Sequence, residues 1–155
     1  MLIYEVPGRR IEIHQVVLDF NGTIACDGQL LPGVAGRLQA LAERLKVYIL
    51  TADTFGTAAA ACRNLPVVLT KVDSQAGGPD KERIITELGA EHTAAIGNGV
   101  NDAQMLGRAA LGLLVLGPEG AAFQAMQQAD MVFTDILDAL DFLLKPQRVV
   151  ATLRP

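Results

Sequence analysis

The feature of this sequence that is best suited to catalysis or ligand binding is an acidic residue at the end of an apolar run. Residues 16–18 are all apolar and lead into Asp19, and Asn21-Gly22-Thr23 follows two positions later. Such a run, bounded by turn residues, is typical of a buried strand in a parallel sheet. Ligands bind outside the carboxyl ends of such strands, where the N–H groups of residues 21–23 could form an anion-binding nest. The alternative is that Asp19 only caps the turn, a common role of aspartate.

Polar residues also follow two other predicted strands. Thr51 follows the strand at 47–50, and Asn98 and Asp102 follow the strand at 93–96. Lys81 begins the helix before that last strand, so its ammonium can point to the same sheet edge. A carboxylate, a hydroxyl, a lysine and a second acid around one point suit phosphoryl transfer, in which a carboxylate can form an aspartyl-phosphate. Each group alone has an ordinary structural explanation.

The elements that must hold these residues alternate between strand and helix. This alternation predicts an α/β fold with a parallel sheet and helices on both faces. Pro7-Gly8 predicts a small N-terminal hairpin, in which His14 lies on the polar side and is expected to face solvent. Residues 73–80 are the most loop-like segment. The predicted strands are 15–20, 47–50, 66–69, 93–96, 111–116 and 131–133. The predicted helices begin near 33, 57, 81, 120 and 135, the last one stopped by Pro146, and a further helix carries Met105 and Leu106.

Length and composition limit the class of protein. The chain has 155 residues, half of them hydrophobic, and a mean hydropathy of +0.30, which predicts one globular domain over residues 1–155. A net charge of −4 and a pI near 5.1 argue against a nucleic-acid partner. No apolar run reaches the ~18 residues of a membrane span, and the first residues lack the layout of a signal peptide. With two cysteines, these features predict a cytoplasmic protein.

Four motifs in the same order give the chain a resemblance to the haloacid dehalogenase superfamily. Residues 19–23 resemble the nucleophile motif, Thr51 closes the second motif, Lys81 in Pro79-Asp80-Lys81 resembles the third, and residues 97–102 resemble the fourth. The second half, through Ala129-Asp130-Met131-Val132, is most similar to the phosphorylation domain of P-type ATPases.

The resemblance implies a Rossmann-like core in which Asp19 is the nucleophile and Mg²⁺ lies between Asp19 and the fourth motif. Phosphorylated substrates, small or macromolecular, would be the partners. The implied catalytic residues are Asp19, Asn21, Thr51 and Lys81; the implied phosphate-binding residues are Gly22, Thr23, Thr51, Ala52 and Lys81; the implied metal ligands are Asp19, the Asn21 backbone carbonyl, Asn98 and Asp102.

Two positions depart from the pattern of the family. Phosphatases usually have an aspartate where this chain has Asn21, and they use it as general acid and base, a function typically worth ~10²–10⁴-fold in rate. P-type ATPases, dehalogenases and phosphonatases also lack an acid there. Metal-dependent members usually have a carboxylate where this chain has Asn98, whose amide oxygen can ligate Mg²⁺ but carries no charge.

The gaps between motifs leave no room for a cap domain or for the nucleotide-binding domain of a pump. Capless relatives often oligomerise or act on macromolecular phosphates, so a homo-oligomer is a further expectation, with Leu2, Ile3 and Tyr4 as a candidate contact surface. Two functions stay open. One is a Mg²⁺-dependent phosphatase or phosphotransferase acting through Asp19, and the other is a non-catalytic phosphate-binding or regulatory protein. A metal-free dehalogenase is a more distant alternative.

Overall fold

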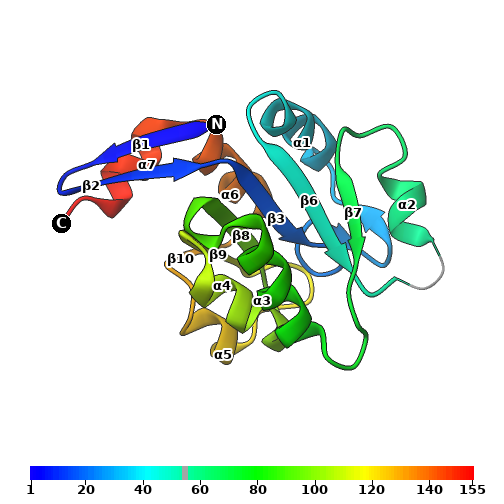
Figure 1. Cartoon of the computed structure of the whole chain (residues 1–155). Coiled ribbons are helices and arrows are strands. Elements are labelled where there is room, and N and C mark those ends of the chain that lie inside the picture. Colours follow the sequence, from blue (N-terminus) through cyan, green and yellow to red (C-terminus); the bar gives the residue numbers. More distant parts are fainter. Residues whose placement is uncertain (54–55) are drawn as a thin grey trace.

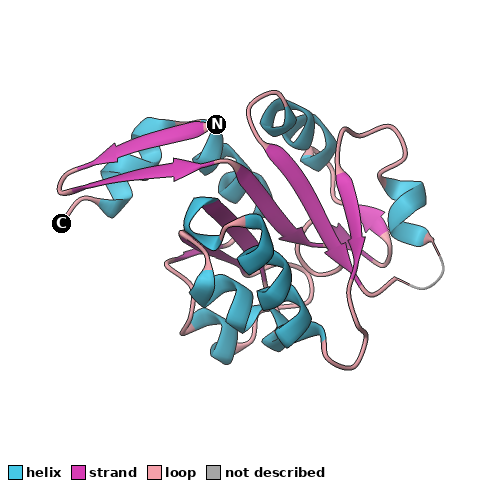
Figure 2. Cartoon of the chain, viewed as in Figure 1, coloured by secondary structure: helices cyan, strands magenta, loops and turns pink. Residues whose placement is uncertain are grey.

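A computed structural model describes residues 1–53 and 56–155, and its centre is a six-stranded parallel sheet (Figures 1 and 2). The strands lie in the order β10-β9-β8-β3-β6-β7, so β3, the first strand of this sheet along the chain, lies in its interior and later strands extend the sheet on both sides. The predicted parallel sheet is thereby confirmed. Its strands are β3 (Gln15–Asp19), β6 (Lys46–Thr51), β7 (Val68–Lys71), β8 (Thr93–Gly97), β9 (Leu111–Val115) and β10 (Met131–Phe133).

Helices cover both faces of the sheet, as predicted. On one face lie α1 and α6, and on the other lie α3 and α4. The helical elements are α1 (Val34–Ala42), α2 (Thr57–Ala61), α3 (Gly77–Leu88), η1 (Ala90–His92), η2 (Val100–Asp102), α4 (Ala103–Arg108), α5 (Phe123–Met126), α6 (Ile136–Leu144) and α7 (Pro146–Leu153).

The central strand β3 shows why the sheet requires two layers of helices. Val16 and Leu18 pack in the same core as α1 and α6, whereas Val17 points to the opposite core, beside α3 and α4. Successive strand residues alternate between faces, and here both faces are apolar because both are covered. The pairing of β3 with β6 and β8 places Asp19 beside Leu50 and at the same end of the sheet as Gly97.

The N-terminal hairpin consists of β1 (Leu2–Val6) and β2 (Arg9–Ile13), and it is packed more closely than the sequence predicts. Leu2 and Tyr4 are buried, and the Tyr4 hydroxyl donates to the Leu143 carbonyl at 2.8 Å. Of the proposed contact surface, therefore, only Ile3 is partly exposed. The helix expected from residue 135 ends before Pro146, as predicted, but it is not the last helix, because Pro146 begins α7, which lies along β1 (Figure 1). Proline is tolerated in the first turn because its missing N–H has no intrahelical partner there.

Two other element boundaries differ from the prediction. Helix α3 begins at Gly77, inside the segment expected to be a loop, so Lys81 lies in its second turn. A Cβ at Gly78 would approach the Gln104 side chain to 2.8 Å, so this glycine allows α3 to lie close to α4. The third strand runs from Val68 and not from Pro66, because proline has no N–H to donate to a neighbouring strand.

Between β3 and α1, the chain forms only a small flap of two short antiparallel strands, β4 (Ala25–Cys26) and β5 (Gln29–Leu30). The described residues therefore contain no cap domain, as expected. Within those residues, no helix combines the length and the apolar character needed to cross a membrane.

Candidate active site

An ion-pair trio lies at the carboxyl edge of the sheet. The Lys81 ammonium donates to Asp19 Oδ1 and to Asp102 Oδ1, both at 2.7 Å. Lys81 is 1% exposed and Asp102 is fully buried, whereas 15% of the Asp19 side chain is accessible. Three residues that are far apart in the sequence therefore meet at one point, and only Asp19 faces the solvent there.

The charges of the trio do not balance. Burial raises the pKa of the Asp19 carboxyl to about 6, and the nearby Asp102 carboxylate adds to this rise while Lys81 opposes it. For Lys81, burial alone would lower the pKa, but the two carboxylates outweigh it and the pKa rises. With all three groups charged, the trio has an excess of one negative charge, at the position where Asp19 opens to solvent.

Asp102 is held by the protein on both of its oxygens. Oδ1 accepts from Lys81, and Oδ2 accepts from the backbone N–H groups of Asn98 and Gly99, at 2.9 Å each. Gly97 makes this arrangement possible, because a Cβ there would lie 2.5 Å from the Asp102 carboxyl carbon. The structure therefore gives Asp102 contacts that position Lys81 and the fourth motif, whereas the sequence suggested a metal ligand.

The loop after Asp19 closes on itself. Thr23 donates its hydroxyl to Asn98 Oδ1 at 3.1 Å and lies 3.4 Å from Asp19 Oδ2. The N–H of Gly22 donates to the Ala25 carbonyl, and the N–H of Thr23 donates to the Phe20 carbonyl. The expected anion-binding nest is thus wrong for Gly22 and Thr23, because the loop itself uses these two donors.

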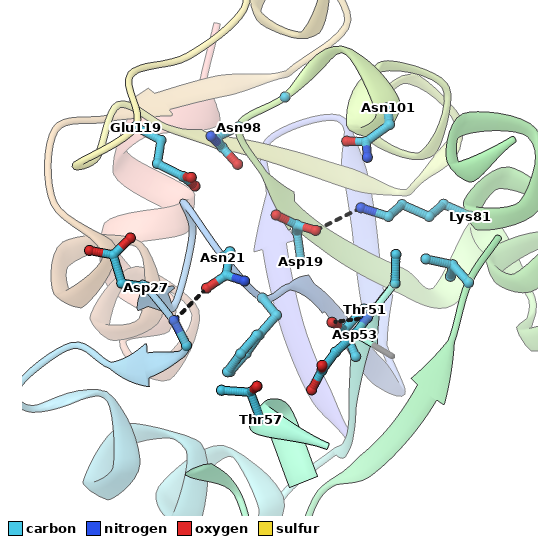
Figure 3. Close-up of a pocket in the computed structure, with 15 residues that line it drawn as sticks. Asp19, Asn21, Asp27, Thr51, Asp53, Thr57, Lys81, Asn98, Asn101 and Glu119 are labelled. Carbon is cyan, nitrogen blue, oxygen red and sulfur yellow. Dashed lines mark hydrogen bonds and ion pairs between the residues drawn. The ribbon is translucent and has the colours of Figure 1, made fainter. Parts of the chain in front are cut away.

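The side chain of Asn21 joins the loop to the flap. Its Oδ1 accepts a hydrogen bond from the Gly28 N–H at 3.0 Å (Figure 3). Gly28 has a φ of +80°, and its N–H belongs to the turn between β4 and β5. Asn21 therefore has a structural task, which a carboxylate in its place could also perform.

Thr51 and Ala52 line the same pocket as Asp19 and Lys81. The Thr51 hydroxyl oxygen accepts from the Asp53 N–H at 3.1 Å, and the Asp53 carboxylate accepts from the Ala58 N–H at the start of α2. The structure thus brings Thr51 to the predicted edge and gives its hydroxyl a fixed position on the side opposite Asn98 (Figure 3).

The pocket has a volume of about 760 Å³ and contains acids that the sequence did not single out. These are Asp27 on the flap, Asp53 after β6 and Glu119 after β9. A Cβ built at Gly22 would lie 2.1 Å from Glu119 Oε2 and 2.7 Å from Asn98 Nδ2, so the Glu119 carboxylate lies over the nucleophile loop, next to Asn98. Glu119 follows β9 and belongs to none of the four motifs, so no sequence motif indicates it.

The oxygen atoms at this edge fit a hard divalent cation. Asp19 Oδ2 and Asn98 Oδ1 lie 3.4 Å and 3.1 Å from the Thr23 hydroxyl oxygen, and the Glu119 carboxylate lies beside Asn98. Mg²⁺ binds through carboxylates, amide and backbone carbonyls and water, usually with few protein ligands. The donors present are of this kind, and the excess negative charge of the trio lies among them.

A match to a family model shows which protein family the chain belongs to. The model of haloacid dehalogenase-like hydrolases matches residues 3–110. The chain belongs to this family. Its match includes the nucleophile loop, Thr51, Lys81 and the fourth motif.

Three proteins that are similar to this one are of different kinds. An uncharacterized protein of Methanocaldococcus jannaschii, MJ0073, is 43% identical over 91 residues, which cover 54% of this chain and 98% of that protein. A 3-deoxy-D-manno-octulosonate 8-phosphate phosphatase from Moraxella catarrhalis, solved with magnesium and phosphate ions, shares the fold with a TM-score of 0.69, 19% identity and 90% coverage of both chains. A zinc-transporting PIB-type ATPase in its E2.Pi state has a TM-score of 0.63 and 26% identity over 80% of this chain and 20% of that chain.

Proposed function

We propose that this protein is a Mg²⁺-dependent phosphotransferase or phosphatase that forms an aspartyl-phosphate on Asp19. The observation that carries the proposal is the Lys81 ammonium, which bridges Asp19 and a buried Asp102 beside an open pocket. A buried lysine at this point orients the Asp19 carboxylate, of which one oxygen would attack phosphorus and the other would ligate the metal. It also supplies positive charge for the oxygens of a phosphoryl group.

The proposed reaction has two covalent steps. An Asp19 oxygen attacks phosphorus, the bond from phosphorus to the leaving oxygen breaks, and water later hydrolyses the acyl phosphate to regenerate Asp19. Lys81 and Thr51 both line the pocket, and they would hold the phosphoryl oxygens. The described ranges place no cap over the pocket, so the remainder of a large substrate has room outside it.

The proposed metal site comprises Asp19, the Asn21 backbone carbonyl and Asn98, with Glu119 in reach of the same place. When bound, Mg²⁺ would offset the negative charge of the phosphoryl group and of Asp19. Support comes from the oxygen donors at this edge and from the M. catarrhalis phosphatase, which was solved with magnesium. Asp102 remains in the proposal as the residue that positions Lys81.

The amide at Asn21 favours a particular class of substrate. It cannot give a proton to a leaving oxygen, so substrates whose leaving group departs as a stable anion should react fastest. Acyl phosphates, aryl phosphates and phosphoanhydrides meet this condition, and alkyl phosphomonoesters do not. The similarity to a zinc-transporting ATPase agrees with this expectation, because ATP is a phosphoanhydride. The match covers 20% of the ATPase chain.

The alternative is a phosphate-binding or regulatory protein without turnover. Its supporting observation is the loss of two carboxylates, at Asn21 and Asn98, in one pocket. This protein would bind phosphate and Mg²⁺ but would not transfer a phosphoryl group.

One experiment separates the two functions. The protein is incubated with Mg²⁺ and acetyl phosphate, quenched in acid and analysed by intact mass. The expected result is the addition of one phosphoryl group, which must be absent from Asp19→Asn. The Asn-Gly pairs at 21–22 and 98–99 can deamidate, so the mass of the starting protein is checked first. If the folded protein binds phosphate yet never gains a phosphoryl group, the binding function replaces the enzyme.

A further inference from the structure

Both histidines of the chain lie together at the amino-terminal end of the sheet, away from Asp19. His14 lies between β2 and β3, and His92 ends η1 just before β8. Their rings are parallel, with an interplanar angle of 5° and centroids 4.3 Å apart. The sequence predicted exposure for His14, which is correct, but it gave no sign of a second histidine beside it.

The backbone fixes His14 on two sides. Its N–H donates to the His92 carbonyl at 2.8 Å, and its own carbonyl accepts from the Lys46 N–H at 3.1 Å. The two histidines are thus neighbours across the junction between the hairpin and the sheet. Their side chains leave this junction from fixed positions, which reduces the entropy lost when both bind one ligand.

A hydrogen bond assigns the tautomer of His92. Its Nδ1 lies 3.1 Å from the Glu12 backbone carbonyl, which can only accept, so Nδ1 carries the proton. In the neutral ring the lone pair is then on Nε2. Histidines that ligate metals usually donate their other N–H to a carbonyl or carboxylate in this way, which fixes the ring.

Glu12 contributes a third donor. It belongs to β2 and precedes His14 by two residues. One donor atom from each of Glu12, His14 and His92 lies within 4.8 Å of the other two. The Glu12 carboxylate also pairs with Arg10 at 2.8 Å, but both side chains are partly exposed, and such pairs contribute little.

We propose that Glu12, His14 and His92 form a second metal site, for one divalent transition ion such as Zn²⁺. Two imidazoles and one carboxylate suit Zn²⁺, with water in a fourth position, whereas Mg²⁺ prefers oxygen ligands. Tetrahedral zinc holds its ligand atoms ~3.3 Å apart, so the three donors must approach one another. The exposed His14 ring and the Glu12 side chain can rotate to do this.

The site would fasten the hairpin to the sheet. Glu12 belongs to β2 and His14 follows it, whereas His92 leads into β8, so one ion would connect the N-terminal segment to the centre of the sheet. Binding to the folded protein alone raises its stability by mass action. With free Zn²⁺ at about 100 times Kd, the melting temperature should rise by roughly 5–10 °C.

The test uses the imidazole nitrogens as reporters, because the chain has only two histidines. The full chain, labelled with ¹⁵N and held in excess Mg²⁺ to occupy the catalytic edge, is titrated with Zn²⁺. We expect both rings to show a metal-bound nitrogen, saturating together at one equivalent. Saturation with one ring or neither ring bound overturns the proposal, and leaves a stacked pair that holds no ion.

Variants then test the carboxylate and the stability effect. Glu12→Gln and His14→Ala should each weaken Zn²⁺ binding by at least about tenfold, so at the same free Zn²⁺ the rise in melting temperature should fall to about half or less. Glu91→Gln is the matched control, because it removes the same charge next to His92 while its carboxylate lies by Gly89. If Glu91→Gln weakens binding as much as Glu12→Gln, the effect is one of general charge and the proposed ligand set is wrong.

Discussion

Asn21 accepts a hydrogen bond of 3.0 Å from the backbone N–H of Gly28, which ties the nucleophile loop to the flap over the pocket. The bond needs only one acceptor oxygen. A carboxylate at position 21 would keep this contact through one oxygen and have the other free for proton transfer. The structure of the loop therefore does not require an amide at position 21. We expect the amide to affect which substrates react, because it cannot transfer a proton to the leaving group.

Asn21→Asp should change the dependence of rate on the leaving group. In the natural protein, we expect rates on aryl phosphates to fall steeply as the pKa of the leaving phenol rises. The variant can protonate the leaving oxygen, so its rate on alkyl phosphates should rise by about 10²-fold and the dependence should flatten. Rates across a series of aryl and alkyl phosphates measure both effects. Asp19→Asn in each background is the control, and an unchanged slope would contradict the general-acid explanation.

Asn98→Asp should tighten Mg²⁺ binding. Asn98 Oδ1 now accepts from the Thr23 hydroxyl, and a carboxylate can accept the same bond while adding a charge next to Asp19. The charge attracts the cation, so Kd should fall by roughly tenfold. Without the ion, the added repulsion should lower the melting temperature in EDTA. Calorimetric titration and melting with and without Mg²⁺ measure both effects. Equal Kd values for the two proteins would place the ion away from Asn98.

The fold could be predicted from the sequence because its strongest signals are local. Apolar runs such as residues 16–18 are buried on both faces, so they identify the strands of a covered parallel sheet. The errors occurred where tertiary contacts override local preference. Gly77 and Gly78 resemble a loop, but they begin α3 because it lies close to Asn101 and Gln104. Pro146 follows the end of α6, as predicted, but it also opens a further helix that packs on β1.

For the candidate site, the sequence predicted which residues lie close together better than it predicted the hydrogen bonds between them. That Asp19, Lys81 and Asp102 share one sheet edge follows from the parallel topology. The topology does not indicate which donors already have a partner. The N–H groups of Gly22 and Thr23 donate to carbonyls of the loop itself, and the sequence does not reveal this turn. Glu119 was missed for another reason: it lies 98 residues after Asn21 in the numbering and reaches the loop only through the strand order of the sheet.

Lys81→Met should destabilise the protein at neutral pH. The change leaves Asp19 and Asp102 close together without their common cation, and breaking a buried ion pair on one side costs about 3–5 kcal/mol. Chemical denaturation in EDTA at pH 8 should show this loss. Lys71→Met, on the exposed edge strand β7, is a matched control that should have little effect.

The pH dependence of the Lys81→Met effect follows from the pKa of Asp19. In the folded protein that pKa is raised to about 6, so the folded state binds a proton more readily than the unfolded chain and loses relative stability as pH rises from about 4 to 6. Lys81 opposes the rise, so its removal should raise the pKa further. The destabilisation should therefore be smaller at pH 5 than at pH 8. An equal loss at both values would mean that Asp19 is not the group whose charge is affected.

Glu119→Gln should weaken Mg²⁺ binding, because the Glu119 carboxylate lies over Gly22 beside the neutral Asn98 and can provide the charge that Asn98 lacks. We expect Kd to rise by about tenfold, with the rate at saturating Mg²⁺ little changed. Asp27→Asn is the matched control, since it removes the same charge from the flap side of the same pocket (Figure 3). A local contribution of Glu119 predicts a much smaller change for Asp27→Asn. If the two variants raise Kd equally, only the overall charge of the pocket matters.

The double variant Asn98→Asp, Glu119→Gln provides an independent check. When Asn98→Asp supplies the carboxylate, the further change in Kd from Glu119→Gln should shrink. Additive effects on Kd in the double variant would contradict a shared role of the two residues at one ion.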